Sequence, residues 1–171
     1  MKRINLIGLF ASMAAFLLLA SCGTSNMTPL QKKAQEQKVA NSVWEQLDAK
    51  SFTIDVDYMN PLRGGGKALN TPYSITVDGN TIDSHLPYVG EAQNIPYGGG
   101  KGLTFKDEIL EYKDGGLQKD RRIITLTTNN GEDKLTYTIT VFDNGKADIH
   151  VNSRNRDDIG YIGSLVLDEK E

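Results

Sequence analysis

The residue with the most specific chemistry in this sequence is Cys22, its single cysteine. Two basic residues precede an apolar run from Ile4 to Ala20, and Leu19-Ala20-Ser21 stands directly before the thiol. A basic start, an apolar stretch and small residues at the cleavage point are typical of an exported protein, and in bacterial lipoproteins the cysteine at that point is alkylated by a diacylglycerol. We therefore expect residues 1–21 to be a cleaved signal peptide and Cys22 to be the lipidated first residue of the mature chain.

The predicted anchor also sets the expected location. The alternative, an uncleaved membrane-spanning helix, is disfavoured because the apolar run is short for a span and contains Asn5 and Gly8. One acyl chain holds a protein only marginally, whereas two or more anchor it stably, so we expect the membrane to be a lasting partner. Gly23, and not aspartate, follows the cysteine. This favours the outer membrane, with the domain in the periplasm.

Two carboxylate pairs could in principle carry out acid–base chemistry. Asp55 and Asp57 alternate along one predicted strand, and Glu108 and Glu111 are close in sequence. A hydrolase that uses carboxylates is therefore a third hypothesis. It is the weakest, because neither pair is accompanied by a recognisable nucleophile or by partners at catalytic spacing. We predict no catalytic residue.

The remaining candidate motifs indicate structure more than chemistry. His85 and His150 fall on the polar phase of separate strands, so they are expected at the surface and not in a metal site. Gly-Gly-Gly-Lys occurs at 64–67 and at 98–101, but neither lysine is followed by the Ser or Thr of a phosphate loop. With one cysteine, the chain can form no internal disulfide. We expect no metal and no cofactor.

Charge excludes one class of partner. Without the two basic residues of the predicted signal peptide, 17 basic residues face 22 acidic ones, a formal net charge of 17 − 22 = −5. Nucleic-acid binding needs a clustered basic face that neutralises phosphates. We therefore expect no nucleic acid as a partner.

The elements that must position these residues begin with a helix. Residues 22–28 combine the lipidated cysteine with a small, polar tether. Thr28-Pro29 is typical of an N-cap followed by the first helical position. Over residues 29–50, apolar side chains recur at helical spacing only in the second half, at Ala40, Val43, Trp44 and Leu47. We expect this amphipathic helix to pack through that second half.

After residue 50 the apolar period changes from helical spacing to two, which predicts strands. In one of them Leu135, Tyr137, Ile139 and Val141 alternate with threonines. One face should therefore be buried and the other wet. Turn sequences, among them Asp78-Gly79-Asn80, Asp114-Gly115-Gly116 and Asp143-Asn144-Gly145, separate the runs. The predicted strands are 52–58, 74–77, 81–86, 103–112, 122–128, 135–142, 147–151 and 159–167.

These elements predict a mainly β (α+β) fold. An N-terminal helix precedes about eight antiparallel strands in a meander, and residues 51–171 form one antiparallel β domain. The meander could stay an open sheet or close into a lipocalin-like barrel. Local patterns do not distinguish the two.

Several segments together resemble a known family. They are Phe52 to Pro61, Leu86-Pro87-Tyr88-Val89-Gly90, Gly102 to Phe105 and Arg156 to Gly163. Over about residues 40–167 the chain is similar to the family named domain of unknown function 4251, whose members look like lipoproteins of Bacteroides-type Gram-negative bacteria. The resemblance implies an envelope context and no mechanism.

Within those segments, four residues are candidates for ligand contact. Pro87 ends a strand, so Tyr88 should be presented at the rim, and Gly90 can adopt a conformation that other residues avoid. Arg156 could pair with Asp157, with Asp158 or with a carboxylate across the sheet. The candidate ligand-binding set is Tyr88, Gly90, Arg156 and Tyr161, and structural roles for the same residues are the alternative.

Three functions follow in order of preference. The first is a non-enzymatic cell-envelope lipoprotein, a binding or structural module for an envelope protein or a glycan. The second is a lipocalin-like carrier that holds a small apolar ligand inside a barrel. The third is the carboxylate hydrolase.

Overall fold

We describe residues 27–91 and 102–167 of a computed structural model of the chain. The predicted signal peptide, Cys22 and the second Gly-Gly-Gly-Lys sequence lie outside these residues. The chain divides into two compact units, Met1–Lys33 and Ala34–Glu171. Only the first turns of helix α2 (Pro29–Asp48) are described in the first unit, so the account below concerns the second unit.

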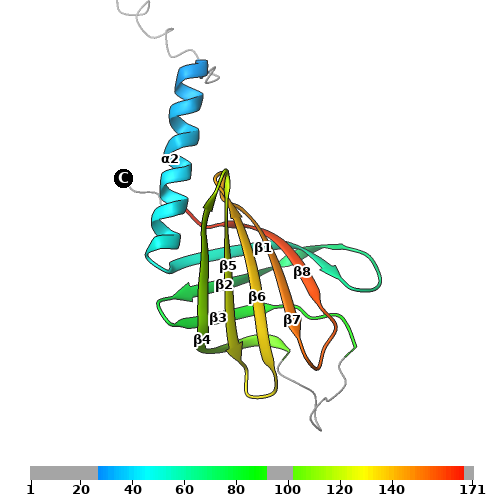
Figure 1. Cartoon of the computed structure of the whole chain (residues 1–171). Helices are drawn as coiled ribbons and strands as arrows, with labels where there is room; N and C mark the ends of the chain where they lie inside the picture. The colour runs from blue at the N-terminus through cyan, green and yellow to red at the C-terminus, as the bar shows by residue number, and fades with distance from the viewer. Residues whose placement is uncertain (1–26, 92–101, 168–171) are drawn as a thin grey trace, which may run out of the picture. The chain divides into compact units, whose positions relative to one another are not determined.

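The second unit is an eight-stranded antiparallel β-barrel (Figure 1). Each strand pairs with its neighbours in sequence, and β1 also pairs with β8, from Ile54 opposite Leu165 to Pro61 opposite Ile159. Of the two predicted alternatives, the structure therefore has the closed barrel. The strands are β1 (Ser51–Pro61), β2 (Lys67–Asp78), β3 (Thr81–Leu86), β4 (Leu103–Gln118), β5 (Arg121–Asn129), β6 (Lys134–Phe142), β7 (Lys146–Ser153) and β8 (Ile159–Leu165).

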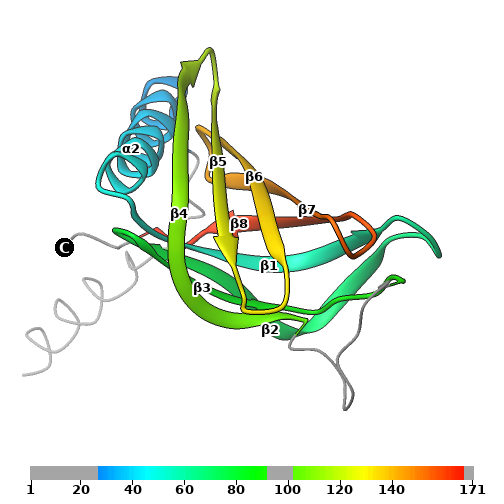
Figure 2. The ribbon, with the colours of Figure 1, turned by 60° about the horizontal axis from the view of Figure 1, so that its bottom comes forward.

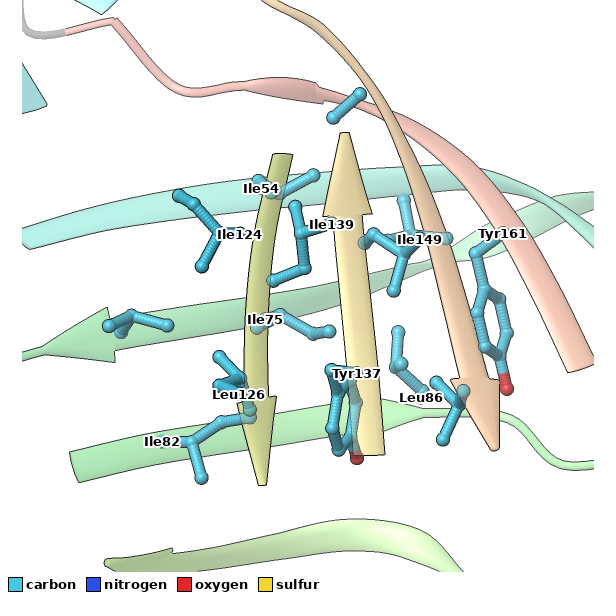
Figure 3. Packing of buried hydrophobic residues seen from close by; sticks show 14 of the residues in the cluster. Ile54, Ile75, Ile82, Leu86, Ile124, Leu126, Tyr137, Ile139, Ile149 and Tyr161 are labelled. Carbon is cyan, nitrogen blue, oxygen red and sulfur yellow. The ribbon is translucent and has the colours of Figure 1, made fainter. Parts of the chain in front are cut away.

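Alternating side chains fill the interior of the barrel. In β6 the apolar residues Leu135, Tyr137, Ile139 and Val141 are all buried, and the intervening threonines are partly exposed, as predicted. Aliphatic side chains from facing strands meet them in the centre (Figure 3). The period of two in the sequence thus becomes the inside and outside of the closed sheet.

The interior leaves no room for a ligand at its centre. Ile54, Ile75, Ile124, Tyr137 and Ile139 are each 0 % exposed. A side chain that bordered a water-sized void would have surface accessible to that water, so these residues border none. Among the described residues, the middle of the barrel is a packed core, as is usual for barrels of eight strands.

Helix α2 closes one end of the barrel, which we call the helix end. Val43 and Leu47 are buried in the same core cluster as the strands. Val43 also lies beside the β6–β7 turn, where it would contact a Cβ placed on Gly145. In contrast, residues 29–38 are all exposed, so only the second half of the helix packs, as predicted.

The start of α2 has the predicted cap. The Gln31 amide donates to Thr28 Oγ1 at 3.3 Å, and the Thr28 amide donates to Gln31 Oε1 at 2.9 Å. These reciprocal bonds form a capping box, which satisfies two amides that the helix itself leaves free.

A cluster of charges fastens the end of α2 to the β4–β5 hairpin. Arg122 on β5 forms ion pairs with Asp48 and with Asp114, both at 2.6 Å. Nearby, the Lys50 ammonium lies 4.5 Å from the centre of the Tyr112 ring. Burial raises the pKa of Asp114, but hydrogen bonds from Arg122 and from the Gly116 amide outweigh it and hold the pKa below its ordinary value. The Arg122–Asp114 pair therefore stays ionised at neutral pH.

Two strands differ from the prediction. The predicted turn at Asp114-Gly115-Gly116 is wrong: β4 continues to Gln118, and these residues form a bulge in its pairing with β5. β3 pairs with β4 only from Leu103 to Glu108, so the rest of β4 extends past the end of β3, and β4 bends strongly along its length (Figure 2). In addition, β2 begins at Lys67, well before the predicted start at residue 74.

The pairing of β1 with β8 contains an irregularity that needs a glycine. The register shifts between Val56 and Tyr58. At Gly163, a Cβ would lie within 3.1 Å of the backbone of Asp55 and Val56. Only glycine fits this close approach, because the neighbouring atoms are main chain and cannot turn aside.

No helix among the described residues is both long enough and apolar enough to cross a membrane.

Candidate functional site

The barrel end opposite α2 carries a polar network centred on Arg156. We call it the loop end, and it is formed by the β1–β2, β3–β4, β5–β6 and β7–β8 connections. The Arg156 guanidinium pairs with Glu132 at 2.9 Å and lies 3.9 Å from Asp133. Its side chain is only 9 % exposed. The predicted partner across the sheet therefore exists, on the β5–β6 connection.

Asp133 is buried but well partnered. Its carboxylate accepts hydrogen bonds from the Ser153 hydroxyl and, at 3.2 Å, from the Asn155 amide group. Its backbone amide donates to Asn130 Oδ1 at 2.8 Å. Buried charge is tolerated when it is paired and hydrogen-bonded in this way. The network thus fixes the β5–β6 connection against the β7–β8 connection.

Tyr88 and Gly90 lie beside Arg156. The Arg156 guanidinium carbon is 5.6 Å from the centre of the Tyr88 ring. The Tyr88 hydroxyl is within hydrogen-bonding distance of the Glu91 and Asp157 carbonyl oxygens, at 3.0 and 3.2 Å. A Cβ on Gly90 would meet that hydroxyl at 2.6 Å. Burial, and then the charge of Asp157, raise the pKa of Tyr88.

Tyr161 is the fourth predicted residue, and it is 1 % exposed. Its hydroxyl donates to the Pro87 carbonyl at 2.6 Å. Burial raises the pKa of Tyr161, and burial likewise raises that of Tyr137, whose hydroxyl bonds Ser84 inside the barrel at 3.2 Å. The structure therefore brings the four predicted residues to one end. A ligand role for them stays a prediction, and the contacts seen are structural.

A polar groove lies next to this network, on the outer side of β6 and β7. Its volume is about 750 Å³, and it is open to solvent. Its walls are the β5–β6 and β7–β8 connections, and its floor is made by outward side chains of the two strands. The lining residues are Asn129, Gly131, Glu132, Asp133, Lys134, Thr136, Asn152, Arg154 and Asn155.

The groove contains two exposed cations that the sequence analysis missed. Arg154 and Lys134 are both exposed, and neither forms an ion pair within the part of the chain that the structure describes. The signal was present as a polar run from Asn152 to Arg156 between two strands. Only Arg156 was singled out, because local sequence does not show that the β5–β6 connection, with Lys134, faces Arg154 across the groove.

The other candidates lie on exposed outer faces. Asp55 and Asp57 on β1, and Glu108 and Glu111 on β4, are all exposed and do not line the groove. Glu111 pairs with Lys113 at 2.8 Å, and that hydrogen bond lowers the pKa of its carboxyl.

Both histidines are exposed, as predicted. His85 stacks on Tyr73 with ring centres 5.3 Å apart, and His150 lies 3.5 Å from Asp158. No group of three potential metal ligands occurs among residues 27–91 and 102–167.

Comparison with known proteins places this barrel in a family. Residues 31–165 match the family described as Domain of unknown function (DUF4251). The chain belongs to this family. A crystal structure of a DUF4251 family protein from Bacteroides eggerthii DSM 20697 has the same fold, with a TM-score of 0.60 and 15 % sequence identity over 79 % of this chain and 91 % of that one. No curated protein matches the chain. The DUF4251 family has no assigned function, so the function must come from the site.

Proposed function

We propose that this DUF4251 protein is a lipid-anchored envelope protein whose barrel is a non-enzymatic binding module, with the groove at the loop end as its binding site. The observation that carries the proposal is the packed interior. Ile75, Leu126 and Ile139 are 0 % exposed, so a ligand cannot lie among them without unfolding the core. Binding therefore has to use the outer surface, where the groove offers the size usual for a ligand site.

The groove also has a rigid frame. Arg156 pairs with Glu132, and Asp133 accepts hydrogen bonds from Ser153 and Asn155, so ion pairs and hydrogen bonds join its two walls. Asn130 fixes the β5–β6 wall itself through the Asp133 amide. A site whose frame is fixed before binding loses less entropy when the ligand arrives. The network thus fixes the shape of the groove before a ligand arrives.

The anchor rests on the sequence around Cys22. The first half of α2 has no buried residue. The second half of α2 packs at the helix end of the barrel, and the groove lies at the opposite, loop end. With Gly23 after the cysteine, we place the protein on the periplasmic side of the outer membrane.

The carrier hypothesis finds no support in the core. A lipocalin-like carrier needs an apolar cavity inside its strands, whereas the central side chains here border no water-sized space. The hydrolase hypothesis likewise gains nothing from geometry, since its carboxylate pairs are exposed and lie outside the groove. Neither is therefore proposed.

A pair of tryptophan substitutions tests the binding site. Asn152→Trp places a large ring in the groove, and Asp148→Trp places the same ring on the same outward face of β7, four residues away. We expect partners captured from detergent-solubilised envelopes by the full chain to be lost with Asn152→Trp and kept with Asp148→Trp. Equal capture by both variants would contradict a groove function.

Mass spectrometry of the membrane-bound protein tests the anchor separately. We expect the first residue to be Cys22 carrying acyl chains, and a Cys22→Ala variant to lose them and leave the membrane fraction. An unmodified thiol, or unchanged membrane recovery of the variant, would contradict the anchor without bearing on the groove.

A further inference from the structure

The two carboxylates that line the groove are already neutralised. Glu132 is paired with Arg156 at 2.9 Å, and Asp133 is 6 % exposed with its oxygens held by Ser153 and Asn155. Neither carboxylate is therefore in a position to attract a cation from solution. The groove thus behaves differently from the chain as a whole, which is acidic.

The exposed charges of the groove are positive. Arg154 sits on the β7–β8 connection and Lys134 begins β6 on the facing wall. No ion pair of either residue occurs in the described ranges 27–91 and 102–167. Lys134 acts on Glu111 only through its field, which contributes after Lys113 to the lowered pKa of that carboxyl. Arg154 is thus the cation most available to a bound molecule.

Two acidic groups oppose this charge and limit where an anion can lie. Asp158 accepts from the Asn152 amide group at 2.7 Å and lies 3.5 Å from His150. Asp157 faces the other way, toward the Glu91 amide at 3.2 Å. An anionic group therefore fits beside Arg154 and Lys134, and not at the Asn152 end of the groove.

The rest of the lining consists of amides and a hydroxyl. Asn129, Asn152 and Asn155 each use one side-chain atom in a local hydrogen bond, and among the described residues the other amide atom has no partner. Thr136 adds a hydroxyl to the lining. No aromatic or aliphatic side chain is among the lining residues. Recognition here depends on hydrogen bonds and charge, which suits a ligand rich in hydroxyl groups and not an apolar one.

We propose that the groove binds a carboxylated saccharide, with its carboxylate held by Arg154 and its hydroxyl groups by the asparagines and Thr136. This inference deepens the proposed function and rests on it, because it assigns a ligand class to the same groove. A guanidinium presents paired N–H donors that match a carboxylate, and it stays charged at every physiological pH. Lys134 adds a second, longer-range attraction. The ligand class follows from both features together, the charge and the hydroxyl-binding amides.

Calorimetric titration of the purified full chain in detergent tests the proposal. The probes are trigalacturonic acid, its methyl ester and triglutamate. The ester keeps the sugar hydroxyls and loses the charge, whereas the peptide keeps the carboxylates and loses the sugar. We expect the acid to bind at least about tenfold more tightly than either of the others. Binding of the acid should also weaken with added salt.

Matched variants assign the charge to its residue. Arg154→Gln should weaken binding of trigalacturonic acid at least about tenfold, and Lys134→Gln should weaken it less. Arg121→Gln removes the same charge at the helix end, where Arg121 lies 6.0 Å from the centre of the Phe142 ring, and should leave binding unchanged. Unchanged melting temperatures show that the variants fold.

The outcomes separate this inference from the proposed function. Equal binding of acid and ester, equal binding by Arg154→Gln and the wild type, or no binding of any probe overturns the carboxylated saccharide. Preferential binding of triglutamate overturns it in favour of an acidic peptide. If the ester binds and Asn152→Trp abolishes that binding, the groove keeps its proposed function and only the ligand class fails.

Discussion

The two ends of the barrel are covered by chemically opposite groups, apolar side chains at the helix end and polar ones at the loop end. At the helix end, the apolar side chains of Val43 and Leu47 cover the core, and a few charges fasten α2 from outside. At the loop end, the described connections are tied together by polar groups, among them the buried Asp133 and the largely covered Arg156. Apolar cover gives stability without specificity. A paired polar network costs desolvation but fixes geometry, which is what a binding groove requires.

The largest effect is expected where apolar cover is removed. Leu47→Ala should lower the free energy of unfolding by about 3 kcal/mol, because it leaves a cavity under α2. Chemical denaturation measures the change. Leu30→Ala, on the exposed first half of the same helix, serves as the control and should change stability by less than about 0.5 kcal/mol. Equal effects at the two positions would mean that α2 does not close the core.

The next effect concerns the loop-end network. Arg156→Gln should lower the free energy of unfolding by about 2 kcal/mol, because Glu132 and Asp133 lose their buried counter-charge. The same variant should weaken binding in the groove, whereas Leu47→Ala should not. Adding Glu132→Gln should recover part of the lost stability. A purely additive loss in the double variant would show that Arg156 and Glu132 are not coupled.

A smaller, pH-dependent effect is expected at the helix end. The pKa of Asp114 is lower in the folded state, so its contribution to stability is present above its unfolded value, about pH 4, and is lost as the pH falls through the lower folded value. Asp114→Asn should cost about 1 kcal/mol at neutral pH. Denaturation midpoints of the variant should also fall less steeply with pH below about 4. Parallel pH profiles would contradict the role of Asp114.

The smallest effects compare one tyrosine from each end. Tyr112 at the helix end has a buried hydroxyl without a hydrogen-bond partner among the described residues, and burial raises its pKa to about 12. Tyr112→Phe should therefore be neutral or stabilising by up to about 0.5 kcal/mol. Tyr161→Phe at the loop end removes the bond to Pro87 and should cost about 1 kcal/mol. The opposite order of the two melting temperatures would contradict the comparison.

Much of this fold could be predicted from local sequence, because the alternation of apolar and polar residues in a strand shows which side chains face the core. The alternation in β6, the Thr28 cap and the Asp143-Asn144-Gly145 turn are all local signals, and all three are found in the structure. Closure could not be predicted, since the pairing of β1 with β8 joins the two ends of the domain. The turn predicted at Asp114 was wrong because those residues form a bulge against β5, and a bulge depends on the pairing with the neighbouring strand.

The site was only partly predictable for the same reason. Tyr88, Gly90, Arg156 and Tyr161 lie at one end of the barrel, and their contacts, such as the Tyr161–Pro87 hydrogen bond, have structural roles. Their role in ligand binding stays a prediction. Arg154, which the proposal uses, drew no attention because its significance depends on Lys134 and Asn129 across the groove. A charged residue in a loop becomes informative only when the facing wall is known.

Amide chemical-shift mapping of the full chain with trigalacturonic acid tests most directly whether binding occurs at the loop-end groove. Our account predicts that the shifts concentrate in residues 129–136 and 152–155, while amides beside core residues such as Ile75 and those of the second half of α2 stay unchanged. Shift changes that concentrate in the barrel core or at the helix end, with the groove amides unchanged, would contradict it.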